Sequence, residues 1–205
     1  MDSYKKLHEA VEFVRRLSEN RSQAGPVASL KAPLKGPVAA AKKGAVANTT
    51  VASEANNNIR TLGVALSPCI LPEAGKPTFE IKNDEIEIGM GIHGEPGIKR
   101  EKLRPANDLV DDLYKRIMND SKLKNNDNIA IMINSLGATP LEELYIISKR
   151  VNENLSNSKI NNVKTYVGRY ATSMEMAGMS ITTLKLSDNL KKNLFAKSEC
   201  PFWNN

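Results

Sequence analysis

Residues 128–144 read NIAIMINSLGATPLEEL and place a buried strand directly before a strongly marked helix start. The unbroken apolar run from Ile129 to Ile133 is typical of a strand that is covered on both faces of its sheet. Thr139 offers a hydroxyl just before the helix, Pro140 fits its first position, and Glu142 stands third in it. The segment therefore predicts a strand, a short glycine-containing turn and a helix that is opened by a capping box.

The sequence on either side continues this alternation of strands and helices. Upstream we predict a helix over 48–60, a short apolar strand at Leu62–Leu66, an alternating strand at Glu85–Ile92 and a helix through Leu109–Ile117; downstream the helix reaches about Leu155, with strands at Val163–Gly168 and Ile181–Leu186. Thr172 and Glu175 form a second capping box for a short helix, whose methionines Met174, Met176 and Met179 we expect in the core. This order of elements indicates an α/β fold, with helices packed on a mixed or parallel sheet.

The composition is that of a globular protein with room for one ordinary domain and a tail. Of the 205 residues, 40% are hydrophobic and 25% are charged, and no apolar run is long enough to span a bilayer. The first residues, Met1–Lys6, lack the apolar stretch of a secretory signal. Cys69 and Cys200 are too few to staple such a domain or to complete a zinc site. We therefore expect a cytoplasmic protein that does not associate with membranes.

Residues 1–47 differ in character from the rest of the chain. An amphipathic helix is predicted over 4–18, and a Pro/Ala/Lys-rich connector follows, in which Pro26, Pro33 and Pro37 forbid one continuous helix. The excess of positive charge also lies in this first quarter, but it is mild and not interleaved with stacking aromatic rings, so nucleic acid is not expected as a partner. We assign 1–47 to a leader and 48–205 to the α/β domain.

The stretch Ile86-Glu87-Ile88-Gly89-Met90-Gly91-Ile92-His93-Gly94-Glu95-Pro96-Gly97 is the most informative for chemistry. It matches G-x-G-x-x-G formally, but a turn follows where the dinucleotide fingerprint requires a helix. Glycines let the backbone approach a ligand closely, and a neutral imidazole such as that of His93 is both a base and a nucleophile. We hypothesise that Glu95 accepts the second ring N–H of His93. The alternative is a tight turn whose histidine only bonds backbone.

Two further loops are candidates for binding. Asn134–Pro140 lies between the buried strand and the capped helix, and it is either an anion site at a helix N-terminus or an ordinary turn. Leu66–Cys69 follows an apolar run. Because Cys69 has no basic neighbour in sequence to lower its pKa, we interpret it as a structural thiol.

At these residues the chain resembles the dihydroxyacetone-binding subunit of dihydroxyacetone (glycerone) kinase. The matching stretches are colinear over about residues 48–205: Gly63–Cys69, Ala74–Phe79, Glu87–Gly97, Asn134–Leu144 (NSLGATPLEEL), Tyr166–Gly178 (YVGRYATSMEMAG) and Pro201–Trp203. The strings HGEPG and LGATPL are highly specific. His-Gly-Glu-Pro-Gly followed by Ile-Lys-Arg most resembles the branch that is served by a phosphotransferase relay.

The resemblance implies a function in glycerol and glycerone metabolism, on an α/β domain with a mixed sheet. His93 would add to the ketone carbon of dihydroxyacetone as a covalent hemiaminal, and Gly91, Gly94 and Glu95 would shape its pocket. Phosphorylation to dihydroxyacetone phosphate would use a separate nucleotide-bearing subunit, which would also hold Mg²⁺, so no cofactor is expected in this chain. Members of the family pair as homodimers.

The chain also departs from that family. Its members carry another α/β domain with a second histidine in the motif GGGSGHEP and with a catalytic aspartate as base, and neither motif occurs here. We therefore expect this chain to correspond to the C-terminal domain, behind a different leader. Two alternatives to a kinase subunit follow: a dihydroxyacetone-binding transcriptional coactivator that does not phosphorylate, and an inactive truncated paralogue.

Overall fold

The computed structural model describes residues 43–91, 96–200 and 203–204. Its elements in chain order are α2 (Lys43–Asn58), β1 (Ile59–Ala65), β2 (Glu85–Ile88), β3 (Lys99–Lys102), α3 (Ala106–Ser121), β4 (Asn128–Ser135), α4 (Leu141–Asn157), β5 (Asn161–Gly168), β6 (Gly178–Lys185), α5 (Asp188–Leu194), β7 (Glu199–Cys200) and β8 (Trp203–Asn204). The helices and strands predicted around the apolar runs are confirmed. In the same part of the chain, no helix is long and apolar enough to cross a membrane.

A six-stranded sheet in the order β3-β2-β1-β6-β4-β5 forms the centre of the domain. Only β4 and β5 run parallel among these neighbours, and α4 connects them; the other neighbours are antiparallel. The sheet is therefore mixed, which is one of the two alternatives that the order of elements left open and the one that the resemblance implied. β6 lies between β1 and β4 and joins the two halves.

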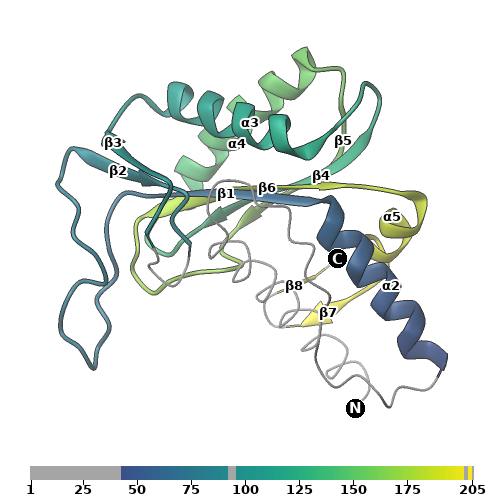
Figure 1. Ribbon diagram of the computed structural model, residues 1–205, viewed down its shortest axis with the longest axis horizontal. Coiled ribbons are helices and arrows are strands. Elements are labelled where there is room, and N and C mark those ends of the chain that lie inside the picture. Colours follow the sequence, from purple (N-terminus) through teal and green to yellow (C-terminus); the bar gives the residue numbers. More distant parts are fainter. Residues whose placement is uncertain (1–42, 92–95, 201–202, 205) are drawn as a thin grey trace.

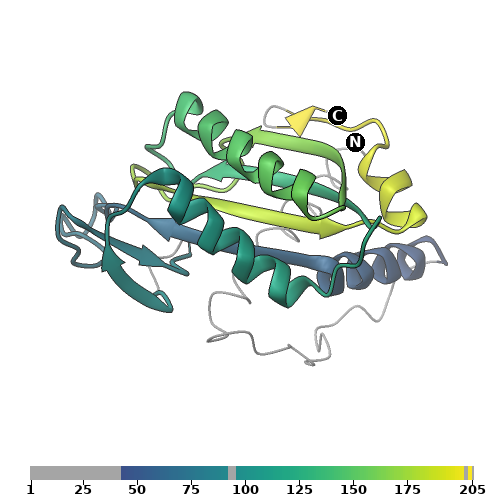
Figure 2. The ribbon, with the colours of Figure 1, turned by 90° about the horizontal axis from the view of Figure 1, so that it is seen from above.

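Helices α3 and α4 cover one face of the sheet (Figures 1 and 2). Side chains alternate along a strand, so Ile129, Ile131 and Ile133 of β4 all point to this face, where they are almost fully buried. They pack against the apolar stripe of α3, which includes Leu113, and that of α4, which includes Val151. This is the main core, and it explains why β4 reads as a continuous apolar run.

The opposite face is covered at one end by α2 and α5 (Figure 1). Ala130 of β4 packs there with Leu186 and Leu190, and Val51 and Ala55 of α2 are partly buried against them. The alternate residues of β4 are thus apolar on this face too, at least near the start of the strand. Among the described residues, loops lie at the other end of this face, and the candidate site is there.

Three sequence-based expectations need correction. No helix forms over 172–179: the chain makes a turn at Met174, which has a positive φ of 48° and is 48% exposed, while Met176 and Met179 are buried as predicted. The strand predicted over Glu85–Ile92 ends at Ile88. The helix predicted over 48–60 starts earlier, because α2 begins at Lys43. The expected helix over 4–18 and most of the connector lie outside the described residues and stay predictions.

An ion pair ties α3 to α4 and makes stability depend on pH. The guanidinium of Arg150 donates to both carboxylate oxygens of Asp111, at 2.8 and 2.6 Å, and this lowers the pKa of Asp111 below its usual value. A lowered pKa stabilises the fold above the ordinary pKa of an aspartate, and the contribution is lost as pH falls through the lowered value. Asp111→Asn should therefore lower Tm by about 1–2 °C at pH 7, since exposed pairs contribute little. In thermal melts the difference from wild type should shrink as pH falls below the ordinary pKa of an aspartate; a constant difference would contradict this assignment.

Candidate functional site

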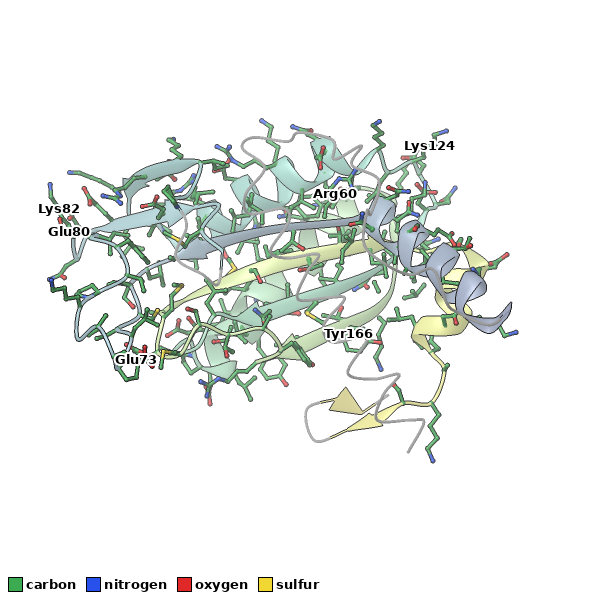
Figure 3. The ribbon with its side chains drawn as sticks, turned by 60° about the horizontal axis from the view of Figure 1, so that its bottom comes forward. Arg60, Glu73, Glu80, Lys82, Lys124 and Tyr166 are labelled. Atoms are coloured by element: carbon green, nitrogen blue, oxygen red, sulfur yellow. The ribbon has the colours of Figure 1, made fainter. Side chains whose placement is uncertain are left out.

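Three connecting segments leave the sheet at the same end. Ala65 at the end of β1 pairs with Gly178 at the start of β6, and Ser135 at the end of β4 pairs with Met179. In Figure 3 the long excursion after β1, marked by Glu73, Glu80 and Lys82, extends from one end of the sheet, whereas Arg60 and Lys124 mark the opposite end. The segments 66–84, 136–140 and 169–177 therefore meet at one end of the sheet.

Asn134 holds one of these segments in place. Its buried side chain accepts hydrogen bonds from the backbone N–H groups of Tyr170 and Ala171, at 2.8 and 2.9 Å, and donates to the carbonyl of Ala171 at 2.7 Å and to the hydroxyl of Ser180 at 3.3 Å. A buried amide is stable only when its donors and acceptors are satisfied. The asparagine of NSLGATPL is therefore a structural support for the loop after β5.

A small apolar cluster joins the glycine-rich loop to the other segments. Met90 is buried against Ala65, Cys69, Leu136 and Met176, which come from the other three segments and the end of β1. Cys69 itself lies 3.4 Å from the hydroxyl oxygen of Ser173. The loop after β2 thus lies beside the loops after β1, β4 and β5. The interpretation of Cys69 as a structural thiol agrees with its burial among these neighbours.

Both ends of the glycine-rich loop are fixed by close contacts. Gly89 has a positive φ of 87° and turns the chain off β2, and its N–H donates to the carbonyl of Gly63 at 2.7 Å. At the returning end, a Cβ on Gly97 would lie 2.4 Å from the carbonyl oxygen of Ile88. Only glycine therefore fits at Gly97 without displacing the backbone of β2. The two ends of the loop meet at the end of β2 and the start of β3.

The predicted site residues lie in or beside this loop. Gly91 is described and is half-buried, whereas His93, Gly94 and Glu95 lie outside the described residues. The chain leaves the strand at Gly89, four positions before His93, so the strand does not extend to the histidine as expected. The suggested pairing of Glu95 with His93 stays a prediction.

The capping box at α4 is absent. The buried hydroxyl of Thr139 donates to the carbonyl of Gly178 at 2.8 Å and accepts from its N–H at 2.9 Å, so it is not free to cap the helix. Pro140 is the residue before the helix, and it has no side-chain cap. A sequence pattern reflects only residues that are close together in the chain. Here Gly178, at the start of β6, bonds to the hydroxyl that the pattern assigned to the helix cap.

The loop before α4 behaves as a structural turn. Leu136 donates its N–H to the carbonyl of Gly178, Gly137 to the hydroxyl of Ser135, and Ala138 to the carbonyl of Met176. These donors are therefore engaged within the protein. Glu142 and Glu143 also place negative charge in the first turn of α4, which disfavours an anion there. Of the two interpretations of this loop, the ordinary turn is favoured.

Sequence reasoning missed Glu87. The alternation of β2 indicated a half-solvated strand, yet Glu87 is only 6% exposed and its carboxylate accepts hydrogen bonds from Gly97 and Arg100. The hydrogen bond from Arg100 raises the pKa of that guanidinium above its usual value. An arginine shortly after the glycine loop was the available signal, because a hairpin can bring it back opposite a strand glutamate.

The described residues also form a groove away from the glycine-rich loop. This groove of about 230 Å³ opens between the starts of α3 and α4, and its lining is largely apolar, including Leu66, Leu109 and Ile147. Within the part of the chain that the structure describes, no group of three or more His, Cys, Asp or Glu side chains could hold a metal ion. The polar lining is confined to Arg104, Thr139 and Glu143, and the hydroxyl of Thr139 already bonds to Gly178, so the loop end of the sheet is the candidate site.

Known proteins share both the sequence and the fold. The dihydroxyacetone-binding subunit of a PTS-dependent dihydroxyacetone kinase from Listeria innocua is 53% identical over 131 residues, which cover 64% of this chain and 40% of that protein. The structure of a dihydroxyacetone kinase operon co-activator has a TM-score of 0.68 at 31% identity, covering 73% of this chain and 47% of that one. The dihydroxyacetone kinase of C. freundii has a TM-score of 0.66 at 27% identity, covering 80% of this chain and 30% of that one.

The chain therefore spans less than half the length of these relatives. Residues 10–202 match the Dak1 domain, so the match includes much of the segment that was assigned to a leader. It also includes the glycine-rich loop and every segment that the structure brings to the same end of the sheet. The chain belongs to the Dak1 domain family.

Proposed function

We propose that this chain is the dihydroxyacetone-binding part of a phosphotransferase-dependent dihydroxyacetone kinase, and that it captures its substrate covalently through His93. The observation that carries the proposal is the HGEPG loop, whose ends are fixed beside the segments after β1, β4 and β5. A 53% identical relative is named as the dihydroxyacetone-binding subunit of such a kinase. Gly91, Gly94 and Glu95 would shape the pocket around the imidazole.

Addition of His93 to the ketone carbon requires no cofactor in this chain. One ring nitrogen of neutral His93 forms a bond to the ketone carbon while the carbonyl π bond breaks; the other ring nitrogen loses its proton, and the former carbonyl oxygen gains one. The product is a hemiaminal that retains every atom of the ketone. The adduct holds a terminal hydroxyl in place for phosphoryl transfer, and such positioning can supply several kcal/mol of a barrier. A partner subunit would bring the nucleotide and Mg²⁺, and two copies of this chain would pair.

Intact mass spectrometry under non-denaturing conditions tests the covalent step. Wild type incubated with dihydroxyacetone should gain the full mass of the ketone, and His93→Ala should gain nothing. His8→Ala is the matched control, because His8 is the other of the two histidines, and it should gain as much as wild type. An equal gain in His93→Ala would contradict the assignment, as would a gain that lacks one water, which is the mark of a lysine imine.

A second candidate function is a coactivator that binds dihydroxyacetone without phosphorylating it. The 31% identity and TM-score of 0.68 to a kinase operon co-activator favour it specifically. Reconstitution with the nucleotide-bearing subunit and the phosphotransferase relay separates the two functions. Formation of dihydroxyacetone phosphate supports the kinase subunit, whereas adduct formation without turnover supports the coactivator. An inactive truncated paralogue should form no adduct at all.

A further inference from the structure

Glu87 places a buried negative charge beside the glycine-rich loop. Its neighbours on β2, Ile86 and Ile88, point into the main core, so Glu87 points to the opposite face of the sheet. There it lies directly across the strand pair from Arg100 of β3. Its side chain is only 8% exposed, while that of Arg100 is 45% exposed. A carboxylate this buried requires partners, and the structure supplies two different ones.

Each carboxylate oxygen of Glu87 has its own partner. Oε2 accepts from Nε and Nη2 of Arg100, at 2.9 and 2.6 Å, which ties the carboxylate to β3. Oε1 accepts from the backbone N–H of Gly97 at 2.8 Å. Gly97 is the last residue of the loop, directly before Ile98, whose N–H bonds to the carbonyl of Ile88 at 2.7 Å. One oxygen therefore holds the hairpin strand and the other holds the loop.

Steric contacts make this arrangement tight. A Cβ on Gly97 would lie 2.7 Å from Cγ of Glu87, in addition to its clash with the backbone of Ile88. On the outgoing side, a Cβ on Gly89 would lie 2.9 Å from the backbone nitrogen of Ile98. The two ends of the loop are thus packed against each other and against β2. His93 lies between these two ends in the sequence.

We propose that Glu87 is a positioning residue, whose carboxylate fixes the returning end of the loop that carries the substrate-capturing histidine. The expected effect on dihydroxyacetone binding rests on the proposed function, whereas the contact between Glu87 and Gly97 does not. The stability of the β2–β3 hairpin alone does not require a buried charge, because replacing a buried ion pair by apolar residues often leaves the free energy of unfolding unchanged. The separate bond to Gly97 is what a positional role requires, because charge-assisted hydrogen bonds to backbone N–H groups are strong and directional.

Glu87→Gln is the decisive variant, because glutamine keeps the size of the side chain but has only one acceptor oxygen. That oxygen goes to the charged guanidinium of Arg100, which is the stronger donor, so the NH₂ group faces the N–H of Gly97 and cannot accept from it. We expect amide hydrogen exchange at Gly97 to become at least about tenfold faster and dihydroxyacetone binding about tenfold weaker. Glu85→Gln is the matched control: Glu85 is on the same strand and the same face, but its carboxylate contacts Lys82, so neither quantity should change.

Arg100→Gln separates loop positioning from strand pairing. This variant leaves Oε1 of Glu87 free to accept from Gly97, so binding should weaken less than in Glu87→Gln. The inference would be overturned if both variants bound dihydroxyacetone equally weakly while the Gly97 amide of Arg100→Gln still exchanged slowly. So would wild-type ketone binding in Glu87→Gln when its Gly97 amide exchanges freely. If wild type forms no adduct, the proposed function fails, and unchanged Gly97 exchange in Glu87→Gln would then separately refute the positional role.

Discussion

Ile131→Ala should lower the free energy of unfolding by about 3 kcal/mol and Tm by roughly 6–12 °C. Ile131 is 1% exposed in the centre of β4, which pairs with both β5 and β6, and its side chain packs under α3 and α4. Truncation to alanine removes apolar contacts and leaves a cavity, because the neighbouring strands and helices cannot collapse onto it fully. Chemical denaturation followed by circular dichroism measures the change.

Ile146→Ala is the control for that substitution, since it makes the same chemical change on the outer side of α4. Ile146 is 56% exposed, and surface substitutions usually change stability by less than about 0.5 kcal/mol. Equal effects at the two positions would mean that β4 is not the centre of the core. A change in the denaturant slope would instead indicate that the denatured state or the two-state behaviour had changed.

Discrimination between dihydroxyacetone and glycerol should depend almost entirely on His93. Glycerol keeps both terminal hydroxyls but lacks a carbonyl, so it cannot form a bond to the imidazole. We expect wild type to prefer dihydroxyacetone over glycerol by at least about 100-fold in isothermal titration calorimetry, a ratio that is difficult to reach when two ligands share most hydrogen-bonding groups. In His93→Ala the preference should fall to within about threefold, because only shared contacts remain.

Glyceraldehyde provides a check on that argument, because it is a three-carbon sugar with a carbonyl group. It should bind wild type better than glycerol and lose that advantage in His93→Ala. If His93→Ala keeps the preference for dihydroxyacetone, hydrogen bonds rather than covalent capture select the substrate. The covalent part of the proposal would then be wrong, while a non-covalent binding role would remain open to the same measurement.

Local sequence patterns predicted most elements of the fold but not the competition between distant groups. The apolar run at Ile129–Ile133 and the stripe of α3 reflect burial within one element, and both were interpreted correctly. The two capping boxes failed because their hydroxyl and carboxylate have partners far along the chain. Thr139 bonds to Gly178, and Glu175 accepts from the backbone N–H of Ile70. Neither contact can be inferred from spacing.

In the candidate site, too, local sequence features were predictable and contacts between distant residues were not. Its glycines and HGEPG string were visible in the sequence, and the structure places the adjoining Met90 beside the other loops at one end of the sheet. Glu87 was not visible as a positioning residue, because alternation along β2 made it look like a solvent-facing side chain. Its role depends on the register of β2 with β3, which sets Arg100 directly opposite. Long-range register determines such contacts, and local pattern does not encode it.

The central claim is that His93 bonds to the ketone carbon, and ¹³C NMR with dihydroxyacetone labelled at that carbon tests it most directly. On binding to wild type, the carbonyl resonance should be replaced by that of a tetrahedral carbon attached to nitrogen, and ¹⁵N-labelling of histidine should split it. His93→Ala should show only the free ketone and its hydrate. A labelled carbon that stays trigonal while the ligand is bound, or a ¹⁵N-split tetrahedral signal that persists in His93→Ala, would contradict the account.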